Sequence, residues 1–402
     1  MKKYISAAAV LGLIVFCGVA AVLQSGEIQE TQDDIEAMAQ AEVIAEEEVP
    51  TSMADWRDNH LKVKGIYVTG PTAGSERMDD IISLVNETEL NAVVIDVKDD
   101  AGNVTFKMNN ENVISMDAGV AYIKDIEKLL AELKKNDIYV IARIPCFKDP
   151  ILAATHPELA LTASDGSPVT DANGNAWVNP TKEEVWDYIL SLVDSCCELG
   201  FDEIQLDYVR FPIGQNAEEA LYGAVSDDDN RQSYITQFLG RVCDEAHKYN
   251  VPVAADVFGT IIKSTADAKH VGQDYVTLVS NLDVICPMIY PSHYAAGEFG
   301  LDVPDAAPYD TIYAALEGSN EALESLRSGD GASSGNAAGG QGANGAVVRP
   351  WLQAFTASWV DGYINYGGPE IRQQIEAVYA AGYEEWILWN SKSDYSMGGL
   401  EK

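Results

Sequence analysis

The stretch Gly200–Pro212 (GFDEIQLDYVRFP) contains the side chains best placed for chemistry. It follows a run of helical character that ends at a glycine, and it then alternates apolar and polar residues, which is the period of a strand. Leu206 and Tyr208 are expected to face one side of this strand, and Gln205 and Asp207 the other. Asp207 either performs chemistry at the carboxyl end of a strand, where parallel α/β folds place reactive groups, or hydrogen-bonds the following loop.

A second carboxyl group would complete the chemistry of glycosidic cleavage, which needs one carboxylate as nucleophile or base and another carboxyl as acid. Asp256 ends the next predicted strand along the chain, so the two side chains are expected to be neighbours. Two carboxyls so close separate their pKa values, and one of them stays protonated as the acid. Asp96 is the competing second carboxylate, with a salt bridge in the barrel mouth as its structural alternative.

Further polar and aromatic side chains near the predicted strand ends fit a sugar-binding site. Aromatic faces stack on the apolar faces of pyranose rings, while Asn, Gln and Arg side chains bind hydroxyl groups. The residues expected to contact the substrate are Tyr67, Asp96, Lys98, Arg143, Arg210, Tyr290, His293, Trp351, Gln353, Trp389 and Asn390. We expect Arg210 to orient a carboxylate rather than to react.

The sequence predicts neither a metal nor a cofactor. Asp99–Asp100 and Asp227–Asp229 lack a full calcium-binding loop, and His293 has no partner histidines for zinc. The sequence also has no G-x-S-x-G nucleophile elbow. Buried free thiols are expected for Cys146, Cys196, Cys197, Cys243 and Cys286, with a bridge from Cys196 or Cys197 to Cys243 as the alternative.

Strands alternating with helices must position these residues. Strands are predicted over Val63–Gly70, Asn91–Lys98, Ile138–Phe147, Gly200–Pro212, Val251–Gly259, Leu282–Tyr290, Val347–Phe355 and Glu385–Asn390. Helices are predicted over Arg77–Leu90, Tyr122–Asn136, Lys182–Leu199, Arg231–Asn250, Asp274–Ser280, Pro308–Leu326 and Pro369–Ala381. This pattern favours an α/β fold with a single (β/α)8 TIM barrel over a doubly wound open sheet, because no Gly-rich phosphate loop follows the first strand.

The N-terminal region is predicted to lie outside the barrel. Residues 1–23 contain two lysines followed by an apolar run, which is typical of a signal peptide or a membrane anchor. Residues 24–62 are acidic and poor in aromatics, so we expect a flexible spacer before the barrel domain at 63–402. A Gly/Ala/Ser-rich loop at 328–346 precedes the seventh strand. The protein is thus expected to be exported, and either membrane-anchored at the cell surface or secreted.

The charge balance limits the partners. The chain has 26 basic and 63 acidic residues, a net charge of −37. Such a surface repels nucleic acids and anionic lipid heads, so we expect no nucleic-acid partner and membrane contact through the N-terminal segment only.

Eight motifs occur in order between Val63 and Tyr395: GIYVTG, VVIDVKDDAG, WVNP, GFDEIQLDYVRFP, DVFG, PMIYPSHY, RPWLQAF and ILWN. Together they resemble a family of exported bacterial (β/α)8-barrel proteins classed as glycoside hydrolases and distantly similar to α-amylase-type barrels. The α-amylase-like pattern implies a nucleophile at Asp207 and an acid at the position of Asp256, where that pattern has Glu. It also implies an Asp after the seventh strand, and none occurs here before Asp361.

The sequence therefore predicts a glycoside hydrolase that cleaves an extracellular or cell-wall polysaccharide, with Asp207 and Asp256 as its catalytic residues. The alternative is a non-catalytic carbohydrate-binding surface protein on the same scaffold. A metal-dependent deacetylase is a third reading, but it needs clustered His and Asp ligands that the motifs do not supply.

Overall fold

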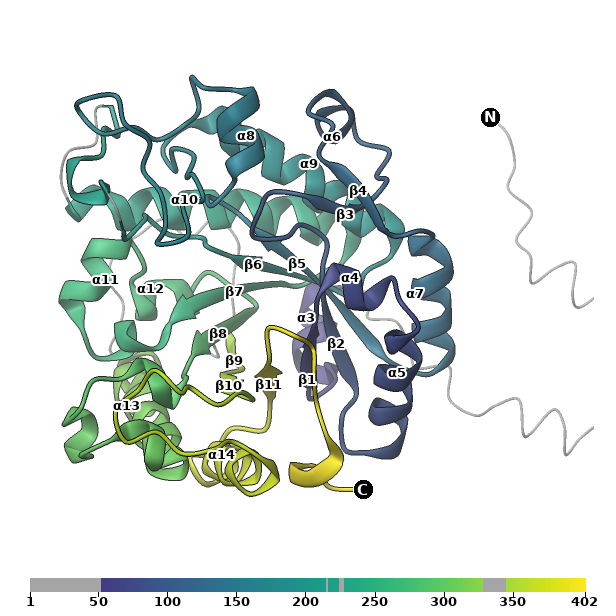
Figure 1. The fold of residues 1–402 in the computed structure, drawn as a ribbon, viewed down its shortest axis with the longest axis vertical. Coiled ribbons are helices and arrows are strands. Elements are labelled where there is room, and N and C mark those ends of the chain that lie inside the picture. The colour runs from purple at the N-terminus through teal and green to yellow at the C-terminus, as the bar shows by residue number, and fades with distance from the viewer. Residues whose placement is uncertain (1–51, 215, 224–227, 328–344) are drawn as a thin grey trace, which may run out of the picture. The chain divides into compact units, whose positions relative to one another are not determined.

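The computed structural model describes residues 52–214, 216–223, 228–327 and 345–402. Its framework is a parallel sheet that closes on itself (Figure 1). The strands of the sheet are β1 (Lys64–Val68), β2 (Ala92–Asp96), β5 (Tyr139–Pro145), β6 (Glu203–Asp207), β7 (Val253–Phe258), β8 (Val284–Met288), β9 (Val347–Val348), β10 (Trp351–Gln353) and β11 (Trp386–Trp389). Closure comes from β11, which pairs with β1 and β10, and from β10, which also pairs with β8. The predicted (β/α)8 barrel is confirmed, with β9 and β10 as two parts of the seventh strand.

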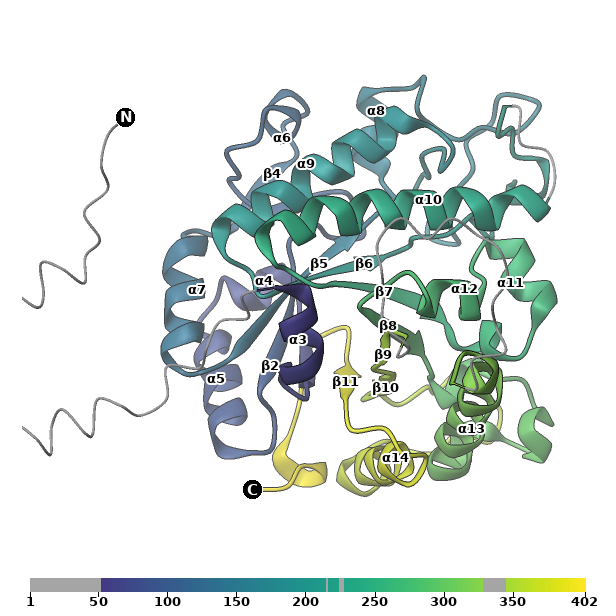
Figure 2. The same cartoon turned by 180° about the vertical axis from the view of Figure 1, so that it is seen from behind.

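Helices alternate with the strands and cover the outside of the barrel (Figures 1 and 2). The outer helices are α5 (Arg77–Glu87), α7 (Ile126–Lys135), α9 (Glu183–Leu199), α10 (Asp228–Ala246), α12 (Tyr275–Val279), α13 (Pro308–Arg327) and α14 (Gly368–Ala380). Four shorter helices lie in the segments that connect a barrel strand to its outer helix: α4 (Gly70–Ala73), α6 (Glu111–Ser115), α8 (Pro150–Thr155) and α11 (Thr265–Val271).

The boundary between α9 and β6 follows from local sequence. Gly200 ends the helix with a φ of 86°, a left-handed conformation that glycine adopts without steric cost. Its N–H bonds the carbonyls of Cys196 and Cys197, and the chain then enters β6. The predicted alternation holds in this strand: Ile204 and Leu206 join the outer core beneath the helices, whereas Gln205 points into the barrel and bonds Asp256.

The seventh strand is interrupted at Arg349 and Pro350, between β9 and β10. The Arg349 side chain is fully buried inside the barrel, where Nη1 lies 2.6 Å from Glu203 Oε1 and Nε lies 2.9 Å from Glu385 Oε2. Glu203 begins β6 and Glu385 precedes β11, so this ion triad ties three segments together near the amino ends of the strands.

The folded unit begins at Ser52 rather than at residue 63, so the expected spacer is wrong over its last part. Here α3 (Met53–Asn59) covers the amino-terminal end of the barrel (Figure 2). The reason is burial: Trp56 is 5% exposed and packs with the apolar side chains inside the barrel. Arg57 pairs with Asp283 at 2.8 Å, which fixes the helix to the segment before β8.

The predicted signal or anchor at 1–23 and most of the spacer lie outside the described residues, as does the loop at 328–346 up to residue 344. Among the described helices, none is both long and apolar enough to cross a membrane.

A second, small sheet formed by β3 (Val104–Phe106) and β4 (Gly119–Ile123) follows β2 and was not predicted. The helix expected from Tyr122 therefore begins later, at Ile126. Asp125 caps it by accepting a hydrogen bond from the Lys128 N–H, and a capping aspartate marks the start of a helix more reliably than the apolar residues before it.

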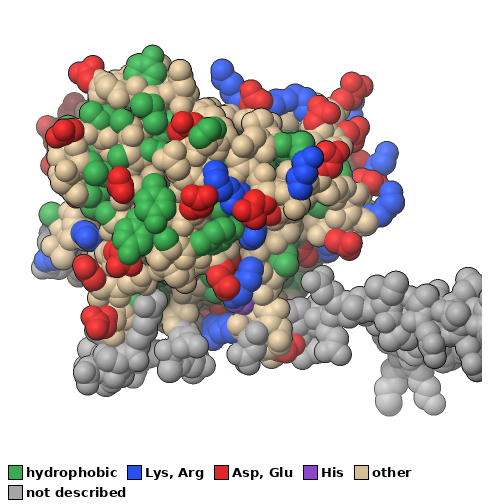
Figure 3. Space-filling model, turned by 90° about the horizontal axis from the view of Figure 1, so that it is seen from below, with side chains coloured by type: hydrophobic (Ala, Val, Ile, Leu, Met, Phe, Trp, Pro, Cys, Tyr) green, Lys and Arg blue, Asp and Glu red, His purple; other side chains and the backbone are tan. Residues whose placement is uncertain are grey.

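The described cysteines are free and buried, as expected from the sequence: Cys146, Cys196, Cys197, Cys243 and Cys286. Figure 3 shows one face of the protein, from below the view of Figure 1, with acidic and basic side chains interspersed among hydrophobic ones. The described residues of this face form no extended basic patch of the kind that binds nucleic acid.

Candidate active site

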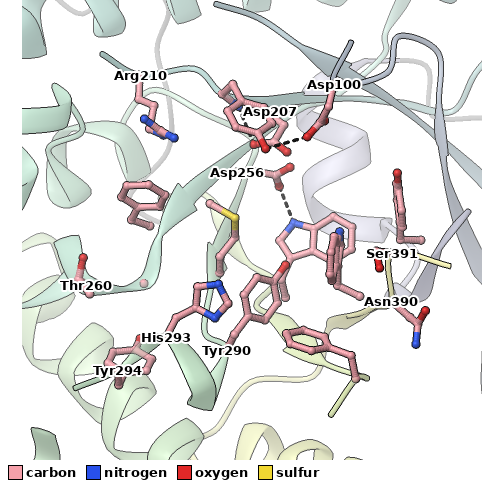
Figure 4. Close-up of a pocket in the computed structure, with 18 of the residues that line it drawn as sticks. Asp100, Asp207, Arg210, Asp256, Thr260, Tyr290, His293, Tyr294, Asn390 and Ser391 are labelled. Carbon is pink, nitrogen blue, oxygen red and sulfur yellow. Dashed lines mark hydrogen bonds between the residues drawn. The ribbon is translucent and has the colours of Figure 1, made fainter. Parts of the chain in front are cut away.

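A cleft of about 1150 Å³ opens at the carboxyl ends of the barrel strands. This is the end at which enzymes of this architecture carry their active sites. The two predicted catalytic residues, Asp207 and Asp256, line it. So do most of the residues predicted to contact substrate: Tyr67, Arg143, Arg210, Tyr290, His293, Trp351, Trp389 and Asn390. The barrel thus gathers side chains from almost every strand into one cavity (Figure 4).

Asp207 ends β6 inside this cleft, and both of its side-chain oxygens accept hydrogen bonds. Arg143 from β5 donates to Oδ2 from Nη2 at 2.5 Å and from Nε at 3.1 Å. The Tyr208 N–H donates to Oδ1 at 2.6 Å. Tyr208 has a φ of 50°, a left-handed conformation that is strained for an aromatic residue. This turn fixes the orientation of the carboxylate beside it.

Asp256 on β7 is the neighbour of Asp207. Leu206 pairs with Ala255 across β6 and β7, so Asp207 and Asp256, each one residue further along, occupy equivalent positions on adjacent strands. Burial raises the pKa of Asp256 well above its usual value, and the charge of Asp207 raises it further. Gln205 Nε2 and Trp351 Nε1 both donate to Oδ1 of Asp256, each at 2.6 Å. The proton therefore resides on Oδ2, the oxygen that lies toward Asp207 in Figure 4.

Arg143 also organises a second group of acids. Its Nη1 bonds Asp96 at 2.6 Å and its Nη2 bonds Asp100 at 3.0 Å. Tyr67 donates its hydroxyl to the other oxygen of Asp96, and burial raises the pKa of Asp96 to about 6. Burial acts in the same direction on Asp100, but Arg143 and Lys148 outweigh it and lower the pKa of that carboxyl.

Three residues expected to bind substrate lie behind the cleft wall. Asp96 is 3% exposed and is satisfied by Arg143 and Tyr67, so it takes the salt-bridge role that was its alternative. The backbone N–H groups of Val97 and Lys98 both donate to one carbonyl, which breaks the alternation of side chains along the strand. The Lys98 side chain is therefore fully buried, and it bonds Asp149 at 2.5 Å.

Gln353 is the third of these residues. Its Nε2 donates to Asp305 at 2.9 Å, and its Oε1 accepts from the Ser292 N–H at 3.0 Å. The side chain is fully buried and joins two of the loops that shape the cleft. Its contribution to the site is therefore structural support.

Aromatic side chains form one wall of the cleft. Tyr67 and Trp389 stack with their ring centroids 6.0 Å apart, and Tyr290 lies 6.0 Å from Trp389. Phe355 and Trp359 continue the wall outward with a second stacked pair, also 6.0 Å apart. Trp359 is 68% exposed, so a large apolar ring face is open to solvent at the cleft rim. Such faces suit sugar rings.

Several cleft residues were not predicted. The Tyr208 hydroxyl donates to Asp100 at 2.8 Å, and Asp100 also accepts from Arg143 at 3.0 Å. Asp100 was considered only as part of a calcium loop; it lies four residues beyond the end of β2, where strand period no longer predicts the direction of a side chain. Phe355 and Trp359 follow β10 in the RPWLQAF segment and beyond, and no local pattern distinguishes them from core aromatics.

Within the described residues, one group of His, Cys, Asp and Glu side chains has metal-like spacing: Cys243, His247 and Asp283, with ligand atoms within 4.8 Å of one another. The Asp283 carboxylate is already bonded by Arg57, by His247 and by the Val253 N–H. Asp283 directly precedes β8, so this group lies at the end of the barrel opposite the cleft. It serves α3 docking rather than the candidate active site.

The profile of a family described as "putative glycosyl hydrolase domain" matches residues 65–395. The chain belongs to this family. The match runs from the second residue of β1 to the segment after β11, so it includes the barrel and the residues that line the cleft. No curated protein matches the chain significantly.

Solved structures are similar at the level of the fold. The glycoside hydrolase domain of PgaB (BpsB) from Bordetella bronchiseptica has a TM-score of 0.58 at 10% identity, covering 83% of this chain and 95% of that one. TtGalA, an α-galactosidase from Thermus thermophilus with stachyose bound, has a TM-score of 0.50 at 12% identity, covering 86% of this chain and 66% of that one. A hypothetical protein from Ruminiclostridium thermocellum ATCC 27405 is 34% identical, with a TM-score of 0.43, over 48% of this chain and 97% of that one.

Proposed function

We propose that the protein is a glycoside hydrolase that cleaves an extracellular or cell-wall polysaccharide with Asp207 and Asp256 as its catalytic residues. One observation carries the proposal: these two carboxyl groups share a cleft but have opposite environments. Arg143 and the Tyr208 N–H stabilise charge on Asp207, whereas burial beside that charge keeps the proton on Asp256. Glycosidic cleavage needs such a pair.

In this mechanism Asp256 protonates the glycosidic oxygen from Oδ2 as the bond to the anomeric carbon breaks. Asp207 acts on the other side of the sugar, either attacking the anomeric carbon or taking a proton from the attacking water. Arg143 contacts Oδ2 of Asp207, so it holds the carboxylate charged and oriented while the positive charge develops on the sugar.

The aromatic wall supports a sugar substrate. Trp389 and Tyr290 offer ring faces beside the two aspartates, and Trp359 offers one at the rim. A cleft that continues from buried to exposed aromatics favours a chain of several sugar units over a single one. The N-terminal sequence of lysines and apolar residues supports action outside the cytoplasm, on material at the cell surface.

The test is release of reducing sugar from a panel of bacterial and plant polysaccharides. Wild type is expected to release sugar from at least one of them, and Asp207→Asn is expected to reduce this release by at least about 10³-fold, since the substitution removes the nucleophile or base. The Tm of the variant should stay near that of wild type. Asp394→Asn, an exposed acid on the same rim, is the matched control and should keep its activity.

Retained turnover in Asp207→Asn would contradict the assignment of this residue. Saturable glycan binding without product from any polysaccharide would instead favour the alternative function, a non-catalytic carbohydrate-binding protein.

A further inference from the structure

Arg210 presents a buried guanidinium group to the cleft and has few partners. The residue is 7% exposed and lines the cavity. Its Nη1 donates to the Phe211 carbonyl at 3.0 Å. Across the part of the chain that the structure describes, this is its one side-chain hydrogen bond, and it forms no ion pair there. A guanidinium has five N–H donors, so most of the donors of Arg210 are left for a ligand.

Aromatic rings hold this guanidinium in place. Its central carbon lies 4.5 Å from the centroid of Phe258, 4.8 Å from that of Trp177 and 5.6 Å from that of Tyr208. Contacts of this kind cover the faces of the group and leave its N–H edge free. Burial lowers the pKa of Arg210 to about 10, which still leaves it charged at neutral pH.

The neighbouring acids do not neutralise it. Asp207 attracts Arg210 over a distance, but its carboxylate oxygens are bonded by Arg143 and Tyr208. Asp267, on the same cleft, is exposed to solvent and forms no salt bridge with Arg210. A buried cation without a counter-ion is costly unless a ligand supplies the opposite charge. Its place in a substrate cleft indicates which ligand that is.

We propose that Arg210 binds a carboxylate on the sugar substrate, so that the polysaccharide contains acidic sugar units such as uronic acids. This inference rests on the proposed function. In Figure 4 the guanidinium reaches the cleft on the side of Thr260, away from Asn390 and Ser391, with the catalytic pair between. The acidic unit therefore occupies the subsite on the Thr260 side of the cleavage point. A carboxylate there accepts two parallel N–H bonds from the fork of Arg210.

The overall charge makes this recognition local. A chain of net charge −37 repels an anionic polymer at long range, so general attraction does not explain a preference for acidic sugars. The preference for acidic sugars therefore comes from a fixed cation inside the cleft.

The experiment measures binding of single sugars, which contain no glycosidic bond and are not hydrolysed. Dissociation constants of the full chain are determined by NMR or calorimetry for glucuronate against glucose, for galacturonate against galactose, and for acetate. We expect at least one uronate to bind about tenfold or more tightly than its neutral partner, the effect of one charge-assisted interaction. Acetate should bind more weakly than that uronate, because it lacks the ring.

Arg210→Met keeps the apolar stem between the aromatic rings but removes the charge, and should abolish the preference for the uronate. Arg210→Lys should retain part of it, since the charge remains without the fork. Lys392→Met removes an exposed cation from the rim of the same cleft and should leave the preference unchanged. Equal binding of uronate and neutral sugar by wild type, or an intact preference in a folded Arg210→Met, would overturn the inference. Because neither result needs turnover, both are independent of whether the protein proves to be a hydrolase.

Discussion

Asp207 and Asp256 have the same side chain, and their surroundings alone separate their roles. Arg143 donates twice to Asp207, whereas no cation among the described residues forms a hydrogen bond or ion pair with Asp256. Gln205 and Trp351 give Asp256 neutral hydrogen bonds that favour its charged form, but burial and the charge of Asp207 outweigh them. In the proposed mechanism, the position of Arg143, burial and the charge of Asp207 together make Asp256 the acid of the pair.

Substitution of Asp256 tests this division of roles. Asp256→Ala should reduce activity on the natural polysaccharide by about 10²- to 10⁴-fold, the usual contribution of a general acid. Dinitrophenyl glycosides release dinitrophenolate, a leaving group that needs no protonation. The loss of activity on these substrates should therefore be much smaller. The same comparison in Asp207→Ala should show no such recovery, because bond cleavage still lacks its nucleophile or base. A uniform loss in Asp256→Ala on both substrate types would contradict the acid role.

The pH profile follows from the same pKa shift. A raised pKa keeps Asp256 protonated at pH values where an ordinary aspartate is ionised, and activity is lost as the pH rises through that pKa. Wild type should therefore show a falling alkaline limb in kcat/KM. This limb should vanish from the residual activity of Asp256→Ala on dinitrophenyl glycosides.

For individual residues, the sequence predicted that Asp207 and Asp256 lie together, and it predicted most of the other residues named for the cleft. The positions of Asp207 and Asp256 could be predicted because the period and order of the strands bring the two residues together, whatever the detail of the side chains. Lys98 was misplaced because two amides contact one carbonyl after Asp96, and a bulge reverses the direction of every side chain that follows. Asp100 was missed for the same reason, since its approach to Arg143 depends on the loop beyond that irregularity.

Between elements, the buried triad of Arg349, Glu203 and Glu385 joins three barrel strands at the end away from the cleft. Arg349→Met should lower the free energy of unfolding by about 3–5 kcal/mol, because it leaves Glu203 buried without a counter-ion and leaves Glu385 with His60 alone. Urea denaturation measures the change. Arg241→Met is the matched control: its guanidinium pairs with Asp187 on the surface, and its loss should cost less than about 1 kcal/mol.

Replacing all three charges distinguishes a structural triad from a general effect of the substitution. Arg349→Met combined with Glu203→Gln and Glu385→Gln removes the uncompensated charges and should recover much of the lost stability. A triple variant less stable than Arg349→Met alone would contradict this account.

The eight barrel strands were predictable because each is a short apolar run with clear ends, repeated around the sheet. The β3–β4 pair was not predictable from the sequence, because β3 has only three residues and β4 is followed by a segment with a helical pattern. The helix α3 was missed because its residues resemble the acidic region before it, and only Trp56 marks it as buried. The role of α3 depends on its packing against the end of the barrel, and this long-range contact leaves no pattern in the local sequence.

For the domain as a whole, α3 closes the barrel end opposite the cleft. Trp56 packs among the side chains of the lumen, Arg57 bonds Asp283, and His60 bonds Glu385 at 2.8 Å. Burial alone would raise the pKa of Asp283, but the hydrogen bonds from His247, Val253 and Arg57 outweigh it and lower that pKa. The pKa of Glu385 is lowered in the same way, by Arg349 and His60.

Two truncations should therefore differ in stability. Removal of residues 1–51 leaves α3 in place, whereas removal of residues 1–60 deletes it and opens the lumen. The longer deletion should lower the free energy of unfolding by at least about 3–5 kcal/mol, the cost of removing one buried tryptophan. Trp56→Ala in the full chain should reproduce most of this loss, which separates the packing of α3 from any effect of chain length.

The difference between the two truncations should also depend on pH in one direction. The folded pKa values of Asp283 and Glu385 lie below their unfolded values, so their stabilisation is complete above about pH 4–5 and is lost as the pH falls through the folded values. Acid thus weakens the contacts of Arg57 and His60, and the gap in unfolding free energy measured at pH 7 should narrow at pH 3. A gap that is absent at pH 7, or that widens in acid, would show that α3 is not held to the barrel by these contacts.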